Sequence, residues 1–459
     1  MVRGILALVG LGAALVCGSA YAVPQLIVKL PAEAVVPPRK AMDGSKLGIF
    51  VPLTDPSGRA LSQFYAALKR AEAGKGKARV VVYGASHMAG DSFTSRVRHW
   101  LQTRFGDAGP GFVVGFKPWR NYNHRDVGIR YSKRWQSYFV SRTRSRPDGL
   151  YGLAGASYAS GSPHDFSRIT TARRGVYGRA VTDVEIFYWK QPRGGDFTVT
   201  IDGKRHRVST RSPRGSCGYA KYKLPAGDHE IEVRPRGNGD VLLFGMALEH
   251  DKPGVVMDTM GINGARASAH LRWKESVYKD HLRKRNPDLM IMAYGTNATG
   301  DHKDPIAAYE ARLDRVLKKL RRAAPTASCI YIGPSDRPSK VYANQLHPRL
   351  IRRMRWRGQW RPVKSRSKKR RMNPVVAFLP RPRQAQVIAV QKRVAHANGC
   401  AYWDWTAMMG GSLSMVRWTY AKPRMGSRDF VHHSGRGYAR AAQLFWDALM
   451  VGFPAKPAQ

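Results

Sequence analysis

Ser86 is the first residue whose position could support chemistry. It follows a valine-rich run, residues 79–84, that predicts a buried strand ending in glycine. Phe93, Val97 and Leu101 then recur at helical spacing, so the serine stands at a strand-to-helix turn. Such a turn holds a hydroxyl at the carboxyl edge of a parallel sheet, beside the free N–H groups that open a helix. Ser86 could therefore act as a nucleophile, although a serine there can also serve only as a helix cap.

Asp429 and His432 form an Asp-x-x-His pattern just before the last predicted helix. At this spacing on a loop, the carboxylate can turn back and accept the Nδ1–H of the imidazole. The Nε2 atom is then free to take a proton from a serine elsewhere in the fold. The neighbouring His433 is interpreted as structural. Because many isolated Asp-x-x-His pairs are capping or surface residues, the pattern gains meaning only together with Ser86.

Asn297 and Gly264 follow two other predicted strands and could stabilise negative charge. Asn297 stands at the end of the buried run 287–294, on the sheet edge that also carries Ser86. A side-chain amide at this edge is a natural oxyanion donor. Gly264 lies in a third strand-end loop, where a glycine leaves its backbone N–H open to a ligand. The predicted oxyanion hole is the N–H groups of Ser86 and Gly264 with the Asn297 amide, and the predicted chemistry needs no metal and no organic cofactor.

These blocks, in this order, resemble the SGNH (GDSL-type) esterase family, whose members use a Ser nucleophile, a backbone glycine, an Asn and an Asp-x-x-His. The resemblance covers nearly all of the chain from about Arg79. It is closest to the exported branch that includes peptidoglycan O-acetylesterases, in which a β-domain separates the first two blocks. The resemblance implies a catalytic Ser86, His432 and Asp429. Two positions depart from the family pattern, since Ala85 replaces the Asp of Gly-Asp-Ser and Ala298 takes the place of a Glu.

The remaining chain predicts the elements that position these residues. Strand and helix patterns alternate over residues 23–160 and 251–459, and we expect an α/β fold there, a flavodoxin-like three-layer sandwich around a parallel sheet. Short alternating strands without helical periodicity predict a small β-sandwich domain inserted at residues 161–250. Residues 119–160 are interpreted as long loops with short strands. Helices are expected at about residues 57–73, 265–283, 305–323, 384–397 and 435–451.

The N-terminus predicts export. A basic start, an apolar stretch and the pattern Ala20-Tyr21-Ala22 are typical of a signal peptide, residues 1–22, cleaved after Ala22. No later stretch is long and apolar enough to cross a membrane. We therefore expect a soluble periplasmic or secreted protein rather than a lipoprotein.

Three cysteines follow the predicted signal peptide, and their spacing fits no metal site. Cys329 and Cys400 lie in predicted core strands. If those strands are neighbours, the two residues can form a disulfide in an oxidising compartment. Two buried free thiols are equally compatible with the sequence.

The formal net charge of +47 indicates anionic partners such as an acidic cell-envelope polymer. Export argues against a physiological nucleic-acid partner. Part of the charge lies in a predicted basic insertion, residues 337–382, where arginines alternate with Trp356 and Trp360 and residues 364–371 are almost wholly cationic. Such a segment can bind nucleic acid or sugars, or it can be a solvated insertion.

The leading hypothesis is an esterase that removes O-acetyl groups from peptidoglycan or another cell-envelope polysaccharide through an acyl-enzyme. An O-acetyltransferase with the same triad is the nearest alternative. A third hypothesis is a non-catalytic protein that binds anionic glycan. Under this hypothesis, Ala85 in place of the family Asp marks the loss of catalysis.

Overall fold

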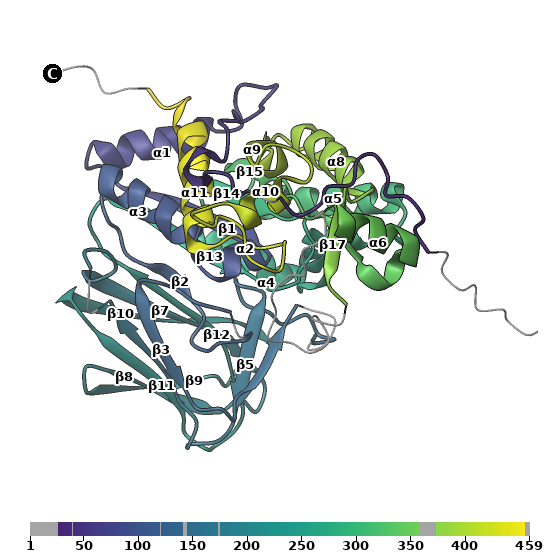
Figure 1. Ribbon diagram of the computed structural model, residues 1–459. Helices are drawn as coiled ribbons and strands as arrows, with labels where there is room; N and C mark the ends of the chain where they lie inside the picture. Colours follow the sequence, from purple (N-terminus) through teal and green to yellow (C-terminus); the bar gives the residue numbers. More distant parts are fainter. Residues whose placement is uncertain are drawn as a thin grey trace, which may run out of the picture.

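The structure is a computed structural model that describes residues 26–38, 40–119, 121–140, 145–172, 175–357 and 373–454. The predicted signal peptide and the most cationic part of the predicted insertion, residues 364–371, lie outside the described residues. A helix-covered parallel sheet occupies the upper part of the molecule in Figure 1, and antiparallel sheets occupy the lower part. No helix within the described ranges is long and apolar enough to cross a membrane.

Five parallel strands form the central sheet, in the order β13-β1-β14-β15-β18. They are β1 (Lys77–Gly84), β13 (Gly254–Gly261), β14 (Leu289–Ala293), β15 (Ser328–Ile332) and β18 (Ala401–Trp403). In chain order this arrangement reads 2-1-3-4-5, which is the flavodoxin-like order. The predicted fold class is confirmed.

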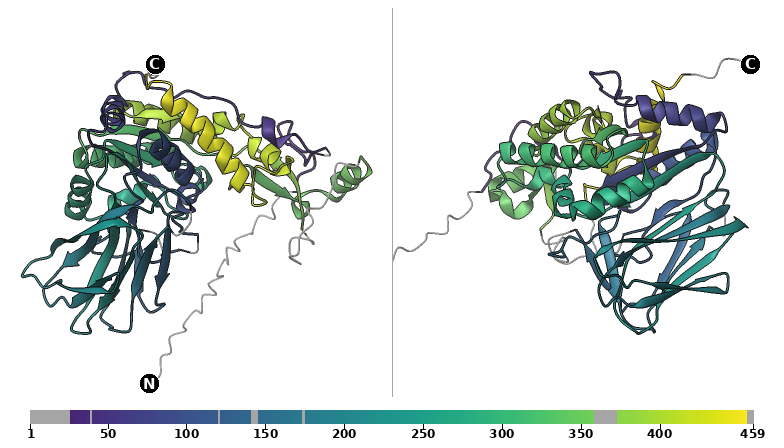
Figure 2. Two further views of the ribbon diagram at one scale, coloured as in Figure 1. Left: turned by 90° about the vertical axis from the view of Figure 1, so that its left-hand side faces the viewer. Right: turned by 180° about the vertical axis from the view of Figure 1, so that it is seen from behind.

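Alternate residues of β1 point into two different cores, because side chains of a strand alternate between its faces. Val80 and Val82 pack in one apolar cluster, and Val81 and Tyr83 pack in the other. The first cluster includes residues of the helices α1 (Ser62–Glu72), α3 (Thr94–Phe105) and α11 (Gly435–Met450). The second includes residues of α4 (Glu275–Arg285), α5 (Ile306–Ala323) and α8 (Gln384–Ala397), which are seen from behind in Figure 2. The sheet is thus buried on both faces, which explains its continuous apolar strands.

Two larger antiparallel sheets lie beside the parallel sheet and confirm the predicted inserted β structure. One has the order β10-β7-β12-β5-β4, with β2 also pairing with β12, and the other has the order β3-β6-β11-β8-β9. The strands are β2 (Gly111–Val113), β3 (Val127–Tyr131), β4 (Gln136–Phe139), β5 (Ala156–Ser160), β6 (Ser167–Thr171), β7 (Val181–Lys190), β8 (Asp196–Ile201), β9 (Lys204–Ser209), β10 (Ser216–Gly227), β11 (Glu230–Pro235) and β12 (Val241–Glu249). Their core is continuous with that of the α4, α5 and α8 face.

These sheets begin earlier in the chain than the predicted limit at residue 161. Strands β2, β3, β4 and β5 all precede this residue and pair within the antiparallel sheets. Residues 119–160, interpreted as long loops with short strands, contain β3, β4 and β5, whereas β2 lies before this segment. These strands are only three to five residues long, too short to be located from an alternating pattern. The antiparallel sheets therefore include strands from before residue 161, and the division of the chain into domains, with its limits, stays a prediction.

The predicted helices near 305–323 and 384–397 match α5 and α8. The helix predicted at 265–283 is instead a 3-10 turn, η2 (Ala267–Arg272), followed by α4 after Trp273 and Lys274. The single helix expected after Ser86 is also divided. A four-residue helix, α2 (Ser86–Ala89), ends at Gly90, and Asp91 then takes a positive φ of 52° before α3 begins.

The predicted basic insertion contains regular structure and a small core of its own. Strands β16 (Ser339–Tyr342) and β17 (Val375–Leu379) pair antiparallel, and α6 (Pro348–Trp356) lies between them in the chain. Val341, Met354 and Ala377 form part of the buried cluster that joins these elements. The described part of the insertion therefore contains regular secondary structure. Trp356 is 86% exposed, whereas Trp360 lies outside the described residues.

Short elements complete the described part of the chain. They are η1 (Gly44–Lys46), η3 (Ala298–Gly300), η4 (Ala343–Gln345), α9 (Trp405–Met408) and α10 (Ser414–Tyr420).

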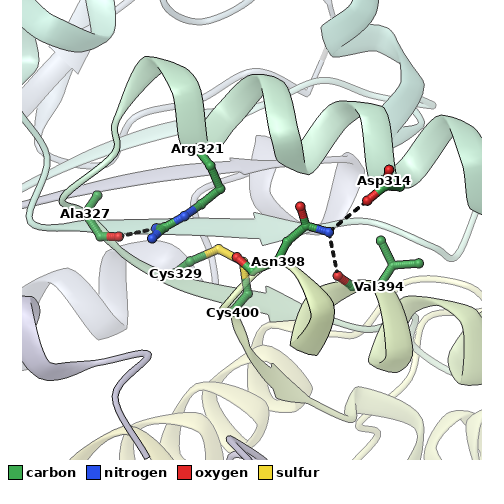
Figure 3. The surroundings of a disulfide bond; sticks show 7 residues. All are labelled: Asp314, Arg321, Ala327, Cys329, Val394, Asn398 and Cys400. Atoms are coloured by element: carbon green, nitrogen blue, oxygen red, sulfur yellow. Dashed lines mark hydrogen bonds between the residues drawn. A yellow bond between two sulfur atoms is a disulfide. The ribbon is translucent and has the colours of Figure 1, made fainter. Parts of the chain in front are cut away.

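Cys329 and Cys400 form a disulfide, which resolves the alternative left open by the sequence (Figure 3). Cys329 is in β15 and Cys400 directly precedes the neighbouring strand β18, so their Cα atoms are 4.5 Å apart. The bond joins two adjacent strands of the parallel sheet. Cys217 is a partly buried free thiol.

Candidate active site

Three of the predicted site residues leave neighbouring strands at one edge of the parallel sheet. Gly84, the last residue of β1, is in register with Gly261 at the end of β13 and with Ala293 at the end of β14. Ser86, Gly264 and Asn297 follow these strand ends within a few residues. Since parallel strands all point the same way, their carboxyl ends bring the three loops together.

The turn at Ser86 is tight and depends on glycine at the end of β1 and at the end of the neighbouring strand β13. The Ala85 N–H donates to Ala293 O at 3.3 Å, so the chain is still attached to β14 just before the serine. A Cβ at Gly84 would lie 2.3 Å from Met88 Cγ, and a Cβ at Gly261 would lie 2.2 Å from Ala89 N. Glycine at these strand ends lets α2 fold back closely onto the sheet.

Ser86, His432 and Asp429 are connected by hydrogen bonds. His432 Nε2 lies 2.8 Å from Ser86 Oγ, and His432 Nδ1 lies 2.6 Å from Asp429 Oδ2. The other carboxylate oxygen, Asp429 Oδ1, accepts the backbone N–H groups of Val431 and His432 at 2.9 and 3.0 Å. The three residues, predicted from two separate stretches, are thus brought together in the order that a nucleophile, a base and an orienting acid require.

Asp429 is ionised at neutral pH. Partial burial alone would raise its pKa, but the hydrogen bonds from the His432 ring and from two backbone N–H groups lower the pKa below the ordinary value of an aspartate. The side chains of His432 and Asp429 are 36% and 44% exposed, so a substrate can reach the histidine from solvent.

The loop that carries Asp429 and His432 is fixed by its own backbone and by β16. Ser427 N–H donates to His432 O at 2.7 Å, which closes the loop on itself. Lys340 Nζ, from β16, donates to Asp429 O at 2.8 Å. The loop then enters α11, whose first turn is capped by the Ser434 side chain. These contacts hold the carboxylate and imidazole in one orientation.

The Asn297 side chain is tied to the Gly264 loop. Its Nδ2 donates to Ala265 O at 3.0 Å, which leaves its second amide hydrogen for a ligand. Gly264 is exposed and has φ +74°, a value that favours glycine. Among the described residues its N–H has no hydrogen-bond partner. Two donors of the kind expected for an oxyanion hole therefore lie on adjoining loops.

His87, directly after Ser86, is a further candidate that the sequence analysis did not assign. It is 6% exposed, its Nδ1 lies 2.9 Å from Tyr438 Oη, and its Nε2 lies 2.8 Å from Ser335 Oγ. Burial, and then the nearby rings of His433 and His432, lower the pKa of His87, so its ring is neutral. The only sequence signal for His87 was its place beside the serine.

His433 is buried in an apolar environment, as its structural interpretation requires. Its ring stacks on Trp405 with centroids 5.6 Å apart, and the Trp405 indole N–H donates to His433 Nε2 at 3.1 Å. Burial lowers the pKa of His433 to about 3.

A pocket of about 210 Å³ adjoins the serine. Its lining comprises Ser86, His87, Gly90, Ser92, Asn121, His432 and Tyr438. Asn121, in the segment interpreted from the sequence as loops, is a second residue that the sequence analysis missed. Of the residues predicted to form the oxyanion hole, Ser86 lines this pocket, whereas Gly264 and Asn297 do not.

The wall that includes Asn121 is held by a buried ion pair network. Arg98, fully buried in α3, contacts the carboxylates of Asp91 and Asp126 at 2.8 and 2.6 Å. Asp91 also accepts the Arg125 backbone N–H at 2.9 Å. This network joins the start of α3 to the segment just after Asn121. Within the described ranges no group of three or more His, Cys, Asp or Glu residues is arranged to hold a metal ion.

Residues 235–440 match the model of the GDSL-like lipase/acylhydrolase family. This range contains Gly264, Asn297, Asp429 and His432 and begins after Ser86. No curated protein matches the chain.

Several solved structures are similar. A peptidoglycan O-acetylesterase is 24% identical with a TM-score of 0.67, and the match covers 86% of this chain and 97% of that chain. A family two carbohydrate esterase from Cellvibrio japonicus is 12% identical with a TM-score of 0.25, covering 71% of this chain and 98% of that chain. A salicylyl-acyltransferase from a tetracycline biosynthetic pathway is 14% identical with a TM-score of 0.28, covering 72% and 96%. The first of these three shares the fold of this chain.

Proposed function

We propose that this protein, which carries a domain of the GDSL-like lipase/acylhydrolase family, is an exported serine esterase that removes O-acetyl groups from peptidoglycan or another cell-envelope polysaccharide. The observation that carries the proposal is the hydrogen-bonded series Ser86, His432 and Asp429 at the edge of the sheet. The fold shared with a peptidoglycan O-acetylesterase supports the choice of substrate.

The proposed reaction proceeds through an acyl-enzyme. Ser86 Oγ attacks the acetyl carbonyl carbon while His432 Nε2 takes the hydroxyl proton, and Asp429 stabilises the imidazolium. The tetrahedral intermediate collapses, the bond to the sugar oxygen breaks, and His432 returns the proton to that oxygen. Water then attacks the acetyl-serine with His432 again as base, which releases acetate and restores Ser86.

Negative charge on the carbonyl oxygen is proposed to be stabilised by the N–H groups of Ser86 and Gly264 and by the Asn297 amide. One donor of this kind contributes on the order of 10²–10³ in rate. The bond from Asn297 to Ala265 O supports this role, because it fixes the amide before substrate binds.

The size of the pocket beside Ser86 favours a short acyl group. Its volume of about 210 Å³ is below that of ordinary ligand pockets, which are roughly 300–1,000 Å³. The polysaccharide chain would therefore lie outside the pocket, over the exposed face of His432. The net charge of +47 would help to retain an anionic polymer there.

The proposal is tested by acetate release from a chromogenic acetyl ester and from O-acetylated peptidoglycan. Ser86→Ala should reduce the rate at least about a thousandfold, whereas the exposed control Ser57→Ala should match the wild type. Equal rates for wild type and Ser86→Ala would refute the proposed triad. Transfer of acetyl to added glycan in preference to water would identify an acetyltransferase instead.

A further inference from the structure

Two arginines beside the Asn297 loop have no carboxylate at salt-bridge distance in the part of the chain that the structure describes. Arg337 follows β15 and Arg381 follows β17, and both side chains are partly buried. Among the described residues neither guanidinium forms a salt bridge. An arginine that is partly removed from water usually has a carboxylate or phosphate beside it, because desolvation of an unpaired charge is unfavourable.

The two guanidinium groups converge on one point next to the loop. Arg337 Nη1 donates to Thr296 O at 3.2 Å, and Arg381 Nε donates to Arg337 O at 3.1 Å. A Cβ at Gly300 would lie 3.0 Å from Arg381 Nη1 and 3.9 Å from Arg337 Nη1. The absence of a side chain at Gly300 thus leaves room for both groups, three residues after Asn297.

Nearby carboxylates already have other partners. Asp301 is paired with Arg266, and Asp336 accepts the Met415 backbone N–H at 2.8 Å. Burial and then the charge of Arg266 lower the pKa of Arg337, and the smaller opposing effects of Asp429 and Asp301 do not offset them. Burial and then the charge of Arg337 lower the pKa of Arg381, against a smaller opposing effect of Asp336. The two positive charges therefore repel one another where water is partly excluded. A bound anion would reduce this repulsion.

We infer that Arg337 and Arg381 form a subsite for a carboxylate of the acylated polysaccharide. The planar guanidinium fork matches a carboxylate in geometry. Residues 296–300 contact the arginine pair and also carry Asn297. When the ester of a sugar is bound at Asn297, a carboxylate on that sugar or on the next one can therefore reach the two guanidinium groups. This inference rests on the proposed function and specifies its substrate as an acidic sugar.

The test compares two esters that differ only near the expected carboxylate. N-acetylmuramic acid acetylated on its primary hydroxyl carries a lactyl carboxylate, and N-acetylglucosamine acetylated at the same hydroxyl does not. The wild type should prefer the acidic ester in kcat/KM by about 10- to 100-fold, the range of a hydrogen bond to a charged group. The preference should lie mainly in KM, because the carboxylate is bound before and during the reaction.

Arg337→Gln and Arg381→Gln should each remove most of this preference. Gly300→Val should do the same without changing charge, because its side chain would displace the Arg381 guanidinium. Arg393→Gln is the matched control, since Arg393 is an exposed arginine of α8 paired with Glu310, and it should keep the preference. Free N-acetylmuramic acid should inhibit the wild type more strongly than N-acetylglucosamine, and this difference should vanish in Arg337→Gln.

The outcomes separate this inference from the proposed function. If the wild type hydrolyses both esters equally well, or if Arg337→Gln and Arg381→Gln retain the preference, the subsite is refuted and the esterase stands. If the wild type hydrolyses neither these esters nor a chromogenic acetyl ester, the proposed function itself fails.

Discussion

Ser86 Oγ and His432 Nε2 lie 2.8 Å apart although 346 positions separate the two residues in the chain. Ser86 is the first residue of α2, just after β1, and α3 follows it, whereas His432 stands just before α11. Phe93, before α3, contacts Phe445 of α11 with ring centroids 5.6 Å apart. The packing of α11 beside α3 therefore brings the proposed base to the proposed nucleophile.

Asp429→Asn should lower kcat about 10⁴-fold, because an amide at this position favours the wrong tautomer of His432. The folded pKa of Asp429 lies below its unfolded value, so its contribution to stability is complete above the unfolded pKa and is lost only as the pH falls below it. Asp429→Asn also lacks this contribution at neutral pH, so thermal unfolding should show one cooperative transition at a somewhat lower Tm, while steady-state kinetics reveal the much larger catalytic defect. Asp228→Asn, at an exposed ion pair of the antiparallel sheets, should have wild-type kinetics. A wild-type kcat for Asp429→Asn would contradict the assignment.

Asn297→Ala should reduce kcat by about 10²–10³ with little change in KM, because the amide acts on charge that develops only in the transition state. Steady-state kinetics with a chromogenic acetyl ester would measure this split. Asn344→Ala, at an exposed position, is the control. A rise in KM with kcat preserved would show that Asn297 binds the substrate and not the oxyanion.

His87→Ala should lower kcat on the order of 10²-fold, since a small misplacement of the adjacent Ser86 is enough for such a loss. The ring is a positioning group held between Tyr438 and Ser335. His87→Gln, which can bond at least one of these hydroxyls, should recover part of the rate. Equal losses in both variants, with a matching fall in thermal stability, would indicate a purely structural residue.

His281→Phe should make the protein more resistant to acid. His281 is 1% exposed, neither ring nitrogen has a hydrogen-bond partner among the described residues, and the ring lies 5.1 Å from that of Phe244. Burial lowers the pKa of His281 from 6.5 to about 4. Between these values the unfolded state binds the proton more readily, so stability falls as the pH is lowered.

From pH 7 to pH 5 this single histidine should account for a loss of about 2 kcal/mol in the free energy of unfolding. Urea unfolding at both pH values should show a smaller loss for His281→Phe than for the wild type. His164→Gln, at an exposed histidine, should behave as the wild type does. An unchanged pH dependence in His281→Phe would rule out this source of acid sensitivity.

Replacement of both Cys329 and Cys400 by alanine should lower the free energy of unfolding by about 4 kcal/mol, the loop-entropy value for a closure of this length. The bond joins residues 71 positions apart and encloses β16, α6 and β17. Chemical denaturation of the double variant and of Cys217→Ala would measure the difference. A loss no larger than that of Cys217→Ala would show that the disulfide contributes little.

The sequence by itself determined the local parts of this protein. Alternation of helix and strand patterns predicted the parallel sheet, since periodicity records which faces are buried. The strand end before Ser86 and the Asp-x-x-His of Asp429 and His432 were recognisable because each depends on residues close in the chain. For the same reason α5 and α8 were predicted closely.

Tertiary structure decided what depends on distant contacts. Strands β2, β3, β4 and β5 are too short to be recognised alone and exist through pairing with later strands. The disulfide required that β15 and β18 be neighbours. His87 has its hydrogen-bond partners only because folding places Tyr438 and Ser335 beside it. In the same way, Arg337 and Arg381 lie together beside Gly300 only in the folded chain. A local pattern shows which face of an element is buried, but the element that covers that face is chosen by the packing of the whole chain.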